Sequence, residues 1–451
     1  MRHWAGHGAG WGLVGLLLAG CSAGAPEPST GSPASDVVAL TGARLIDGTG
    51  REPLEAATIV VADGRIQAVG AEGAVPVPER AARVDLAGKT VMPGLINAHA
   101  HLNNGDPSLP PLDQVRSQLR LYARYGVTTV QSLGSDGAGA GEANLAVRNE
   151  QVAGRIDGAR LLVSGVGLTP GTVEDARPAI DGHADLGVDM IKTRLEGGPG
   201  DMTPDVYRAL IARAHERDLR VAAHIFYLDD AGGLVDAGVD VLAHSIRDQD
   251  VDDAFVERLV SLGVGYIPTL TRDLSVFVYE TRPALFDDPF FLRELDAYEG
   301  QMAQLLDPGL QARTRESPDA QAIKPALAQA LRNLKRLSDG GVTIGLGTDS
   351  GTSLGRWQGY FEHHELAMMV EDAGLTPMEA LVAATGGAAR VLARDDIGTL
   401  APGNLADVLV LDANPLDDIR NTRRIAAVWV AGRQVSPAAT SDAGADDGAA
   451  E

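Results

Sequence analysis

Short apolar runs that alternate with helical stretches restrict the fold of this chain more than any other feature of its sequence. From about residue 90 there are eight such runs, and a stretch such as residues 204–217 (PDVYRALIARAHER) follows with helical periodicity. Repeated strand-then-helix order predicts a parallel sheet, and eight repeats favour a closed (β/α)8 barrel. The predicted strands are residues 90–98, 127–133, 160–166, 190–195, 221–225, 241–243, 265–270 and 343–346.

Both flanks of this region carry shorter segments in which apolar and polar residues alternate, which predicts half-buried strands. They lie within residues 37–90 and again within residues 405–435. We therefore expect residues 37–90 and 398–436 to form one small β-sandwich domain built from both chain ends, with residues 91–397 forming the barrel. An unusually long connection at residues 282–325 follows the seventh strand, and it predicts a functional lid or a disordered segment.

The N-terminal residues have the pattern of a targeting segment. Residues 11–19 are apolar but too short for a permanent membrane helix, and they end in Leu18-Ala19-Gly20-Cys21. This resembles the signal of a bacterial lipoprotein, so we expect a signal peptide over residues 1–20, lipidation of Cys21, and an exported protein anchored on the periplasmic or outer membrane surface. The alternative is an ordinary secretory signal with an incidental cysteine. Residues 21–36 are expected to be a flexible tether and residues 437–451 a disordered acidic tail.

The charge and the cysteine content exclude several kinds of partner. The net charge is −23, which argues against binding DNA or RNA, whose phosphates need clustered Lys and Arg. Because Cys21 is the only cysteine, neither an intrachain disulfide nor a cysteine-based zinc site can form. The sequence leaves open whether the chain is a monomer or a homo-oligomer.

Histidines follow three of the predicted barrel strands. His99 and His101 form an H-x-H pair at the end of the first, and residues i and i+2 of a strand share a face. His224 and His244 end the fifth and sixth strands. Neutral imidazole is the commonest metal ligand among side chains, and barrel enzymes keep their active sites at the carboxyl ends of the strands. These four residues are therefore candidate metal ligands.

A lysine and an aspartate extend this set. Lys192 lies in the fourth strand, where a charged amine is costly to bury, so it either reaches solvent or is a neutral amine that has reacted with CO2. The resulting carbamate has two oxygens suited to bridging two cations. Asp349 follows the eighth strand in Gly347-Thr348-Asp349, where it is either a turn or helix cap, or a carboxylate ligand that also takes a proton from water.

In this order the residues resemble the amidohydrolase superfamily, near its imidazolonepropionase-related and metal-dependent dipeptidase branch. The resemblance covers residues 37–436. Imidazolonepropionases are mononuclear and lack the bridging lysine, so Lys192 makes the chain similar to the two-metal relatives, including prolidase-like and Xaa-Arg dipeptidases. The motifs are PGLINAHAH at 93–101, the Gly347-Thr348-Asp349 element, LTPMEALVAA at 375–384, GTLAPGNLADVLVL at 398–411 and DANP at 412–415.

The resemblance implies two divalent metal ions, with Zn²⁺ expected and Mn²⁺, Co²⁺ or Fe²⁺ as alternatives. His99, His101 and Asp349 would bind the more buried ion, and His224 and His244 the more exposed one. A carboxylated Lys192 and a hydroxide would bridge the two ions. The hydroxide would attack the carbonyl carbon of an amide or peptide C–N bond in a small substrate, while Asp349 moves its proton to the leaving nitrogen.

Candidate substrate contacts follow the same strands. Arg194 shares the face of Lys192 and suggests a substrate with a carboxylate, and Tyr227, Thr269 and Arg272 follow the fifth and seventh strands. His363, with its neighbour His364, opens a later helix and is a further candidate, whereas His183 and His215 are expected to be solvated helix positions.

The ligand set activates water against several bonds and does not choose among them. The alternatives within enzymes are an Xaa-Pro or Xaa-Arg dipeptidase and a hydrolase of lactones or cyclic amides. The alternative outside enzymes is a surface-anchored binder of metal or solute.

Overall fold

The computed structural model describes residues 37–103, 105–135 and 140–435. The predicted signal peptide, the lipidation site Cys21, the tether and the acidic tail lie outside the described residues. Within the described part of the chain, no helix is long and apolar enough to cross a membrane.

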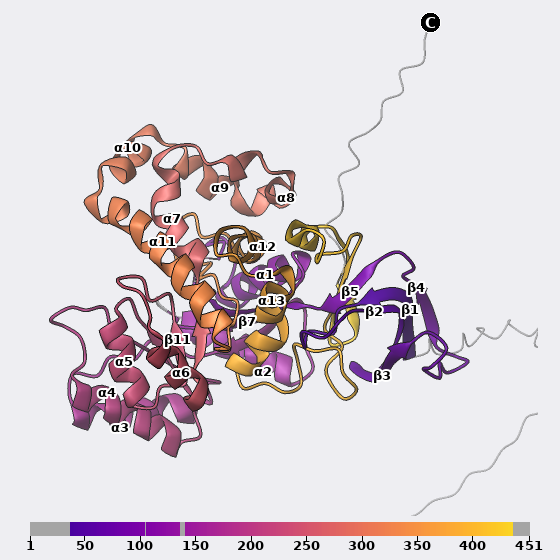
Figure 1. Cartoon of the computed structure of the whole chain (residues 1–451), viewed down its shortest axis with the longest axis horizontal. Helices are drawn as coiled ribbons and strands as arrows, with labels where there is room; N and C mark the ends of the chain where they lie inside the picture. The colour runs from indigo at the N-terminus through magenta and orange to yellow at the C-terminus, as the bar shows by residue number, and fades with distance from the viewer. Residues whose placement is uncertain (1–36, 104, 136–139, 436–451) are drawn as a thin grey trace, which may run out of the picture. The chain divides into compact units, whose positions relative to one another are not determined.

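Strands from the two chain ends share one sheet. Its order is β15-β14-β13-β5-β1-β2-β3, with β4 paired to β1. Strand β5 pairs parallel with β1 and antiparallel with β13, so hydrogen bonds run without a break from one chain end to the other. Figure 1 shows the indigo strands β1 to β5 beside the yellow C-terminal segment. The predicted strands of both ends are thus found together in one continuously hydrogen-bonded sheet, and the two-layered sandwich stays a prediction. The strands are β1 (Val37–Leu45), β2 (Leu54–Ala62), β3 (Arg65–Ala71), β4 (Ala82–Asp85), β5 (Thr90–Pro93), β13 (Val408–Leu411), β14 (Ile425–Val430) and β15 (Arg433–Val435).

The central region forms a TIM-barrel-like array of parallel strands in two sheets, β6-β7-β8 and β12-β11-β10-β9. The first predicted strand, residues 90–98, is divided at Gly94: β5 joins the end sheet and β6 the central one. At Gly94 a Cβ atom would lie 2.1 Å from Thr128 Cγ2, so only glycine fits at this point. The strands are β6 (Leu95–Ala100), β7 (Val127–Ser132), β8 (Arg160–Val163), β9 (Ile191–Arg194), β10 (Val221–His224), β11 (Val241–Ala243) and β12 (Gly265–Ile267).

The predicted closed ring of eight strands is not formed by the assigned strands. Residues 343–346 make only an isolated bridge, between Ile344 and Tyr266 of β12. On the other side, Ala98 of β6 donates its backbone N–H to Leu346 O, but the N–H of Leu346 is directed to Ala383 O and leaves the ladder. The eighth predicted segment therefore lies between β12 and β6 without becoming a regular strand.

Helices follow the strands, as the alternation predicted, and their ends are marked locally. Helix α3 (Val173–Leu186) begins after Thr172, whose hydroxyl accepts from Asp175 N, and ends at Gly187 with φ 70°. Helices α4 (Pro204–Glu216) and α6 (Asp253–Leu262) each bury one apolar face. The others are α1 (Pro111–Arg124), α2 (Ala140–Val152), α5 (Leu228–Asp236), α7 (Leu270–Phe277), α12 (Tyr360–Ala367), α13 (Pro377–Val382) and α14 (Ala388–Val391).

The long connection at 282–325 is helical, so the prediction of a disordered segment is wrong. It contains α8 (Pro289–Leu292), α9 (Leu295–Leu305), α10 (Pro308–Glu316) and the start of α11 (Pro318–Asp339), which lie beside α7 in Figure 1. The physical reason is a cluster of buried aromatic side chains that the segment shares with the rest of the fold. This aromatic cluster includes Tyr125, Tyr279, Phe286, Phe291, Tyr298, Trp357, Tyr360 and Phe361. Its role as a lid stays a prediction.

Candidate metal centre

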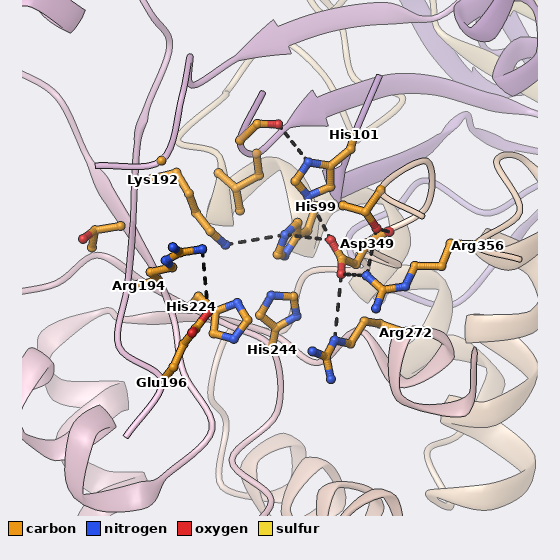
Figure 2. A pocket seen from close by; sticks show the side chains of 15 residues that line it. His99, His101, Lys192, Arg194, Glu196, His224, His244, Arg272, Asp349 and Arg356 are labelled. Carbon is orange, nitrogen blue, oxygen red and sulfur yellow. Dashed lines mark hydrogen bonds and ion pairs between the residues drawn. The ribbon is translucent and has the colours of Figure 1, made fainter. Parts of the chain in front are cut away.

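The six predicted ligands line one cavity of about 260 Å³. They come from the carboxyl ends of different strands: β6 carries His99, β9 carries Lys192 and β10 carries His224. Three more follow shortly after a strand or bridge segment, namely His101, His244 and Asp349. Figure 2 shows all six side chains directed toward a common centre. The tertiary structure therefore brings together residues that span 250 positions of the sequence.

Three of these residues form a compact group of metal-ligating atoms. His101 Nε2 lies 2.8 Å and His99 Nε2 3.5 Å from Asp349 Oδ1. Candidate ligand atoms of His99, His101 and Asp349 all lie within 4.8 Å of one another. Such spacing allows the three side chains to hold one divalent ion.

The remaining ligands adjoin this group. Lys192 Nζ lies 3.5 Å from His99 Nε2. The ring of His244 is centred 4.4 Å from that of His99 and 4.2 Å from that of His224. Lys192 thus lies beside the first group and lines the same cavity as His224 and His244.

Hydrogen bonds set which ring nitrogen faces the cavity. His101 Nδ1 lies 2.8 Å from Gly134 O, and a carbonyl only accepts, so Nδ1 carries the proton and Nε2 offers its lone pair. His244 Nδ1 lies 2.8 Å from Thr269 Oγ1, a hydroxyl that can donate or accept, so this contact orients the ring without fixing its proton. His244, Thr269 and Asp349 all have positive φ, at 73°, 50° and 56°. Such backbone strain is concentrated at functional sites, where the surrounding structure enforces it.

Electrostatics favour the protonation states that metal binding requires. Burial lowers the pKa of His99, His224 and His244 well below the usual value of imidazole, and the charge of Lys192 lowers each further. Burial alone would raise the pKa of Asp349, but the positive charge of Arg356 outweighs burial and holds that pKa well below its usual range. His99, His224 and His244 are therefore neutral imidazoles, and Asp349 is an ionised carboxylate, at neutral pH.

The donor set fits a divalent metal ion. It consists of imidazole nitrogens and carboxylate oxygen, which suit Zn²⁺ and similar ions. His99 Nε2 lies 3.5 Å from both Asp349 Oδ1 and Lys192 Nζ, so the ring nitrogen that would bind an ion is turned toward the other ligands. Ligation would compensate the burial of so many polar groups in one place, because burying polar atoms without partners is costly.

A hydrogen-bond network beneath the centre supports the ligands. Asn97 Oδ1 accepts from His99 N at 3.0 Å, and its amide donates to Thr348 Oγ1 at 2.8 Å and to Glu362. Glu362 Oε1 also accepts from Ser350 Oγ at 3.0 Å. The network joins the His99 strand to the loop that carries Asp349, so it fixes these two ligands relative to one another.

Sequence reasoning missed Asn97, Glu362 and Arg356. Asn97 could have been found, because it lies two residues before His99 in the same strand. Arg356 pairs with Asp349 Oδ2 and donates to Thr352 Oγ1 at 2.8 Å. No periodic signal marks Arg356 or Glu362, since they reach the site only through the path of the chain after Asp349.

The predicted substrate contacts are only partly placed at the cavity. Arg194 and Arg272 line it. Thr269 lies behind His244 and holds that ring. Tyr227 is exposed and is not among the lining residues; its ring covers Gly197, where a Cβ atom would lie 2.1 Å from Tyr227 Cε2.

The structure contradicts two predictions about histidines, namely a substrate contact for His363 and a solvated position for His183. His363 is buried away from the cavity, with Nε2 donating to Tyr125 O at 2.7 Å and Nδ1 3.0 Å from Thr422 Oγ1, so it packs helix α12 against the fold instead of contacting substrate. His183 is buried and not solvated. Each of its ring nitrogens lies 3.1 Å from a backbone carbonyl oxygen, which takes the place of water. His215 is half-exposed beside Asp240, as expected.

Known proteins are similar to this chain in sequence and in fold. Residues 293–435 match the model of the amidohydrolase family. The imidazolonepropionase of Streptomyces avermitilis is 27% identical over 449 residues, covering 95% of this chain and 98% of that protein. The imidazolonepropionase of Mycolicibacterium smegmatis is 29% identical, and the match covers 80% of this chain and 85% of that protein. A Bifidobacterium longum protein provisionally assigned as a prolidase has a crystal structure with a TM-score of 0.72 and 30% identity, covering 89% of this chain and 95% of that chain.

Fold, cavity and relatives together define a metal-dependent hydrolase. Residues 293–435 match the amidohydrolase family, the similarity along the chain supports the amidohydrolase superfamily, and the protein is a hydrolase that acts on carbon–nitrogen bonds.

Proposed function

We propose that this protein hydrolyses an amide or peptide bond of a small substrate at a centre of two divalent metal ions, with Zn²⁺ as the native metal. His99, His101 and Asp349 would hold one ion, and His224 and His244 the other. Carboxylated Lys192 would bridge them. The observation that carries the proposal is the convergence of all six side chains on one cavity.

Bound ions of this kind lower the pKa of water and polarise a scissile carbonyl. The protein supplies the proton transfers. Asp349 Oδ1 faces His99 and His101, while Oδ2 is held by Arg356. In this orientation Oδ1 accepts the proton of the attacking water and delivers it to the leaving nitrogen, acting first as general base and then as general acid.

Lys192 supports a carbamate bridge because it is buried among imidazoles. Its side chain is almost fully buried, and the rings of His99 and His224 have their pKa lowered by its charge. Loss of a proton from the ammonium group would give the neutral amine, whose reaction with CO2 forms an N–C bond and releases a second proton, so that an anion would replace that unfavourable positive charge. The carbamate oxygens would then lie where two cations need a shared ligand.

The metal content of purified Lys192→Ala tests this arrangement. We expect the variant to lose one of two bound ions and most of the activity, and short-chain acids should not restore it fully. Lys324→Ala is the control, because Lys324 forms an ion pair with Glu280 and neither residue lines the cavity. Retention of both ions in Lys192→Ala would count against the bridge.

A substrate panel separates the remaining candidates. It contains dipeptides, including Xaa-Pro and Xaa-Arg, together with N-acyl amino acids, cyclic amides and lactones. The similarity to proteins named imidazolonepropionase makes a cyclic amide the second candidate. Two bound ions without turnover of any compound would favour a binding protein over an enzyme.

We also propose that the protein is exported as a lipoprotein, on the strength of the Leu18-Ala19-Gly20-Cys21 segment. Palmitate labelling should be lost in Cys21→Ala. Label retained by that variant would refute lipidation at this residue.

A further inference from the structure

Two guanidinium groups meet at one carboxylate oxygen in the cavity wall. Arg356 Nη1 is ion-paired with Asp349 Oδ2, and Arg272 Nε lies 3.9 Å from the same oxygen. The two arginine side chains are largely buried, with exposed fractions of 14% and 20%. Figure 2 shows them approaching Asp349 from the side opposite to Lys192 and Arg194.

The charges in this wall do not balance. A third guanidinium, that of Arg247, is buried 4.4 Å from the ring of Phe226 and 3.6 Å from Asp273 Oδ2. The fully buried Asp273 also accepts from Arg272 Nη1 at 2.8 Å. Arg247, Arg272 and Arg356 thus share Asp273 and Asp349, which leaves 3 − 2 = 1 excess positive charge.

Nearby acidic side chains do not cancel this excess. Glu365 is engaged with the backbone N–H groups of Leu270 and Thr271 at 2.6 and 2.7 Å, and burial raises its pKa to about 8, so it is mostly uncharged at neutral pH. Glu196 lies 3.7 Å from Arg194 and compensates that residue. Arg272 Nε is buried without a hydrogen-bond acceptor among the described residues. Like charges at this depth repel strongly, so the wall is suited to receive an anion.

We propose that Arg272 and Arg356 bind a free carboxylate of the substrate, an inference that rests on the proposed amide hydrolysis. A guanidinium offers a planar fork of donors that matches a carboxylate. Both groups surround Asp349, the residue that delivers a proton to the leaving nitrogen. The carboxylate therefore belongs to the leaving amine, and the substrates are N-acyl amino acids or dipeptides with a free C-terminus.

Arg194 is the weaker candidate for this role, although its position in the sequence suggested it. Its side chain is 59% exposed and already faces Glu196. Exposed ion pairs contribute little because water and salt screen them. Arg194 also lies across the cavity from Asp349 in Figure 2, which makes it a matched control.

The test compares two substrates in each variant of the metal-loaded enzyme. They are the best N-acyl amino acid of the panel and its C-terminal carboxamide, which differ only in the charge of the leaving group. The wild type should prefer the acid, and Arg272→Met and Arg356→Met should each lower the acid-to-amide ratio of kcat/KM by about 10- to 100-fold. Arg194→Met should leave the ratio within about 3-fold, as expected of an exposed pair. The ratio is taken within one variant, so general damage to catalysis cancels.

A second measurement separates this inference from the proposed hydrolysis. Calorimetry compares the binding of N-acetyl-L-alanine and N-acetyl-L-alaninamide, and Arg272→Met should lose the preference for the acid. Should that variant fail to fold, Arg272→Lys keeps the charge, loses the planar fork, and should show a smaller decrease. Acid binding that needs Arg272 without turnover of any compound would support the anion site and refute the hydrolysis. An unchanged ratio in both methionine variants, or a ratio lowered only in Arg194→Met, would overturn the anion site and leave the hydrolysis standing.

Discussion

Replacing Phe291 with alanine tests whether the 282–325 segment is an integral part of the fold. Phe291 is fully buried in helix α8. Its ring is centred 4.8 Å from that of Tyr298, 5.0 Å from that of Trp357 and 5.2 Å from that of Tyr360. Truncating a buried Phe to Ala costs about 3–5 kcal/mol through lost transfer energy and the remaining cavity. Because Phe291 also loses several aromatic contacts, we expect a decrease of about 4 kcal/mol in the free energy of unfolding.

Urea denaturation measures this decrease. In a Trp429→Phe background, which removes the tryptophan of the end sheet, the fluorescence of Trp357 reports on the aromatic cluster because its ring contacts Phe291. The control is Leu292→Ala in the same helix, where the side chain is 37% exposed and the expected loss is below about 1 kcal/mol. A loss below about 1 kcal/mol in Phe291→Ala would refute the reasoning. So would unfolding of the cluster well before the rest of the chain, since the segment would then be a separable lid.

Two further predictions concern the site and its surroundings. Thr269→Val removes the hydrogen-bond partner of His244 Nδ1 and should weaken metal binding by about 10- to 100-fold, as measured by competition with a chelator. Unchanged affinity would show that the ring is held by packing alone. Because burial raises the pKa of Glu365 from 4.5 to about 8, the folded protein keeps a proton that the unfolded chain releases. The contribution of Glu365 to stability therefore falls as pH rises between these values, and Glu365→Gln should flatten that part of the stability–pH curve measured by urea denaturation.

The strands that carry the site could be predicted from the sequence because their signals are local. Each of β7 to β12 lies within a predicted apolar run, and a strand's burial is visible in a few consecutive residues. His99, Lys192 and His224 are likewise marked by their places in those runs. Strand ends of parallel units meet at one edge, so chemistry placed at successive strand ends converges.

The parts that sequence reasoning missed depend on contacts between distant segments. Residues 282–325 are ordered by aromatic rings from elsewhere in the chain, such as Tyr125 and Trp357, which no local pattern announces. His363 follows the last barrel segment, yet its ring is turned toward Tyr125 and Thr422 by the packing of α12.

The sequence by itself determined the alternating order of strands and helices and the polar residues that end the strands, because both follow from spacing along the chain. Only the tertiary structure decided that β5 links the two chain ends into one sheet. It also decided that Arg356 and Arg272 meet at Asp349, in a wall with one positive charge in excess. Charge balance in a buried wall depends on how segments far apart in sequence pack together, and no local pattern records that packing.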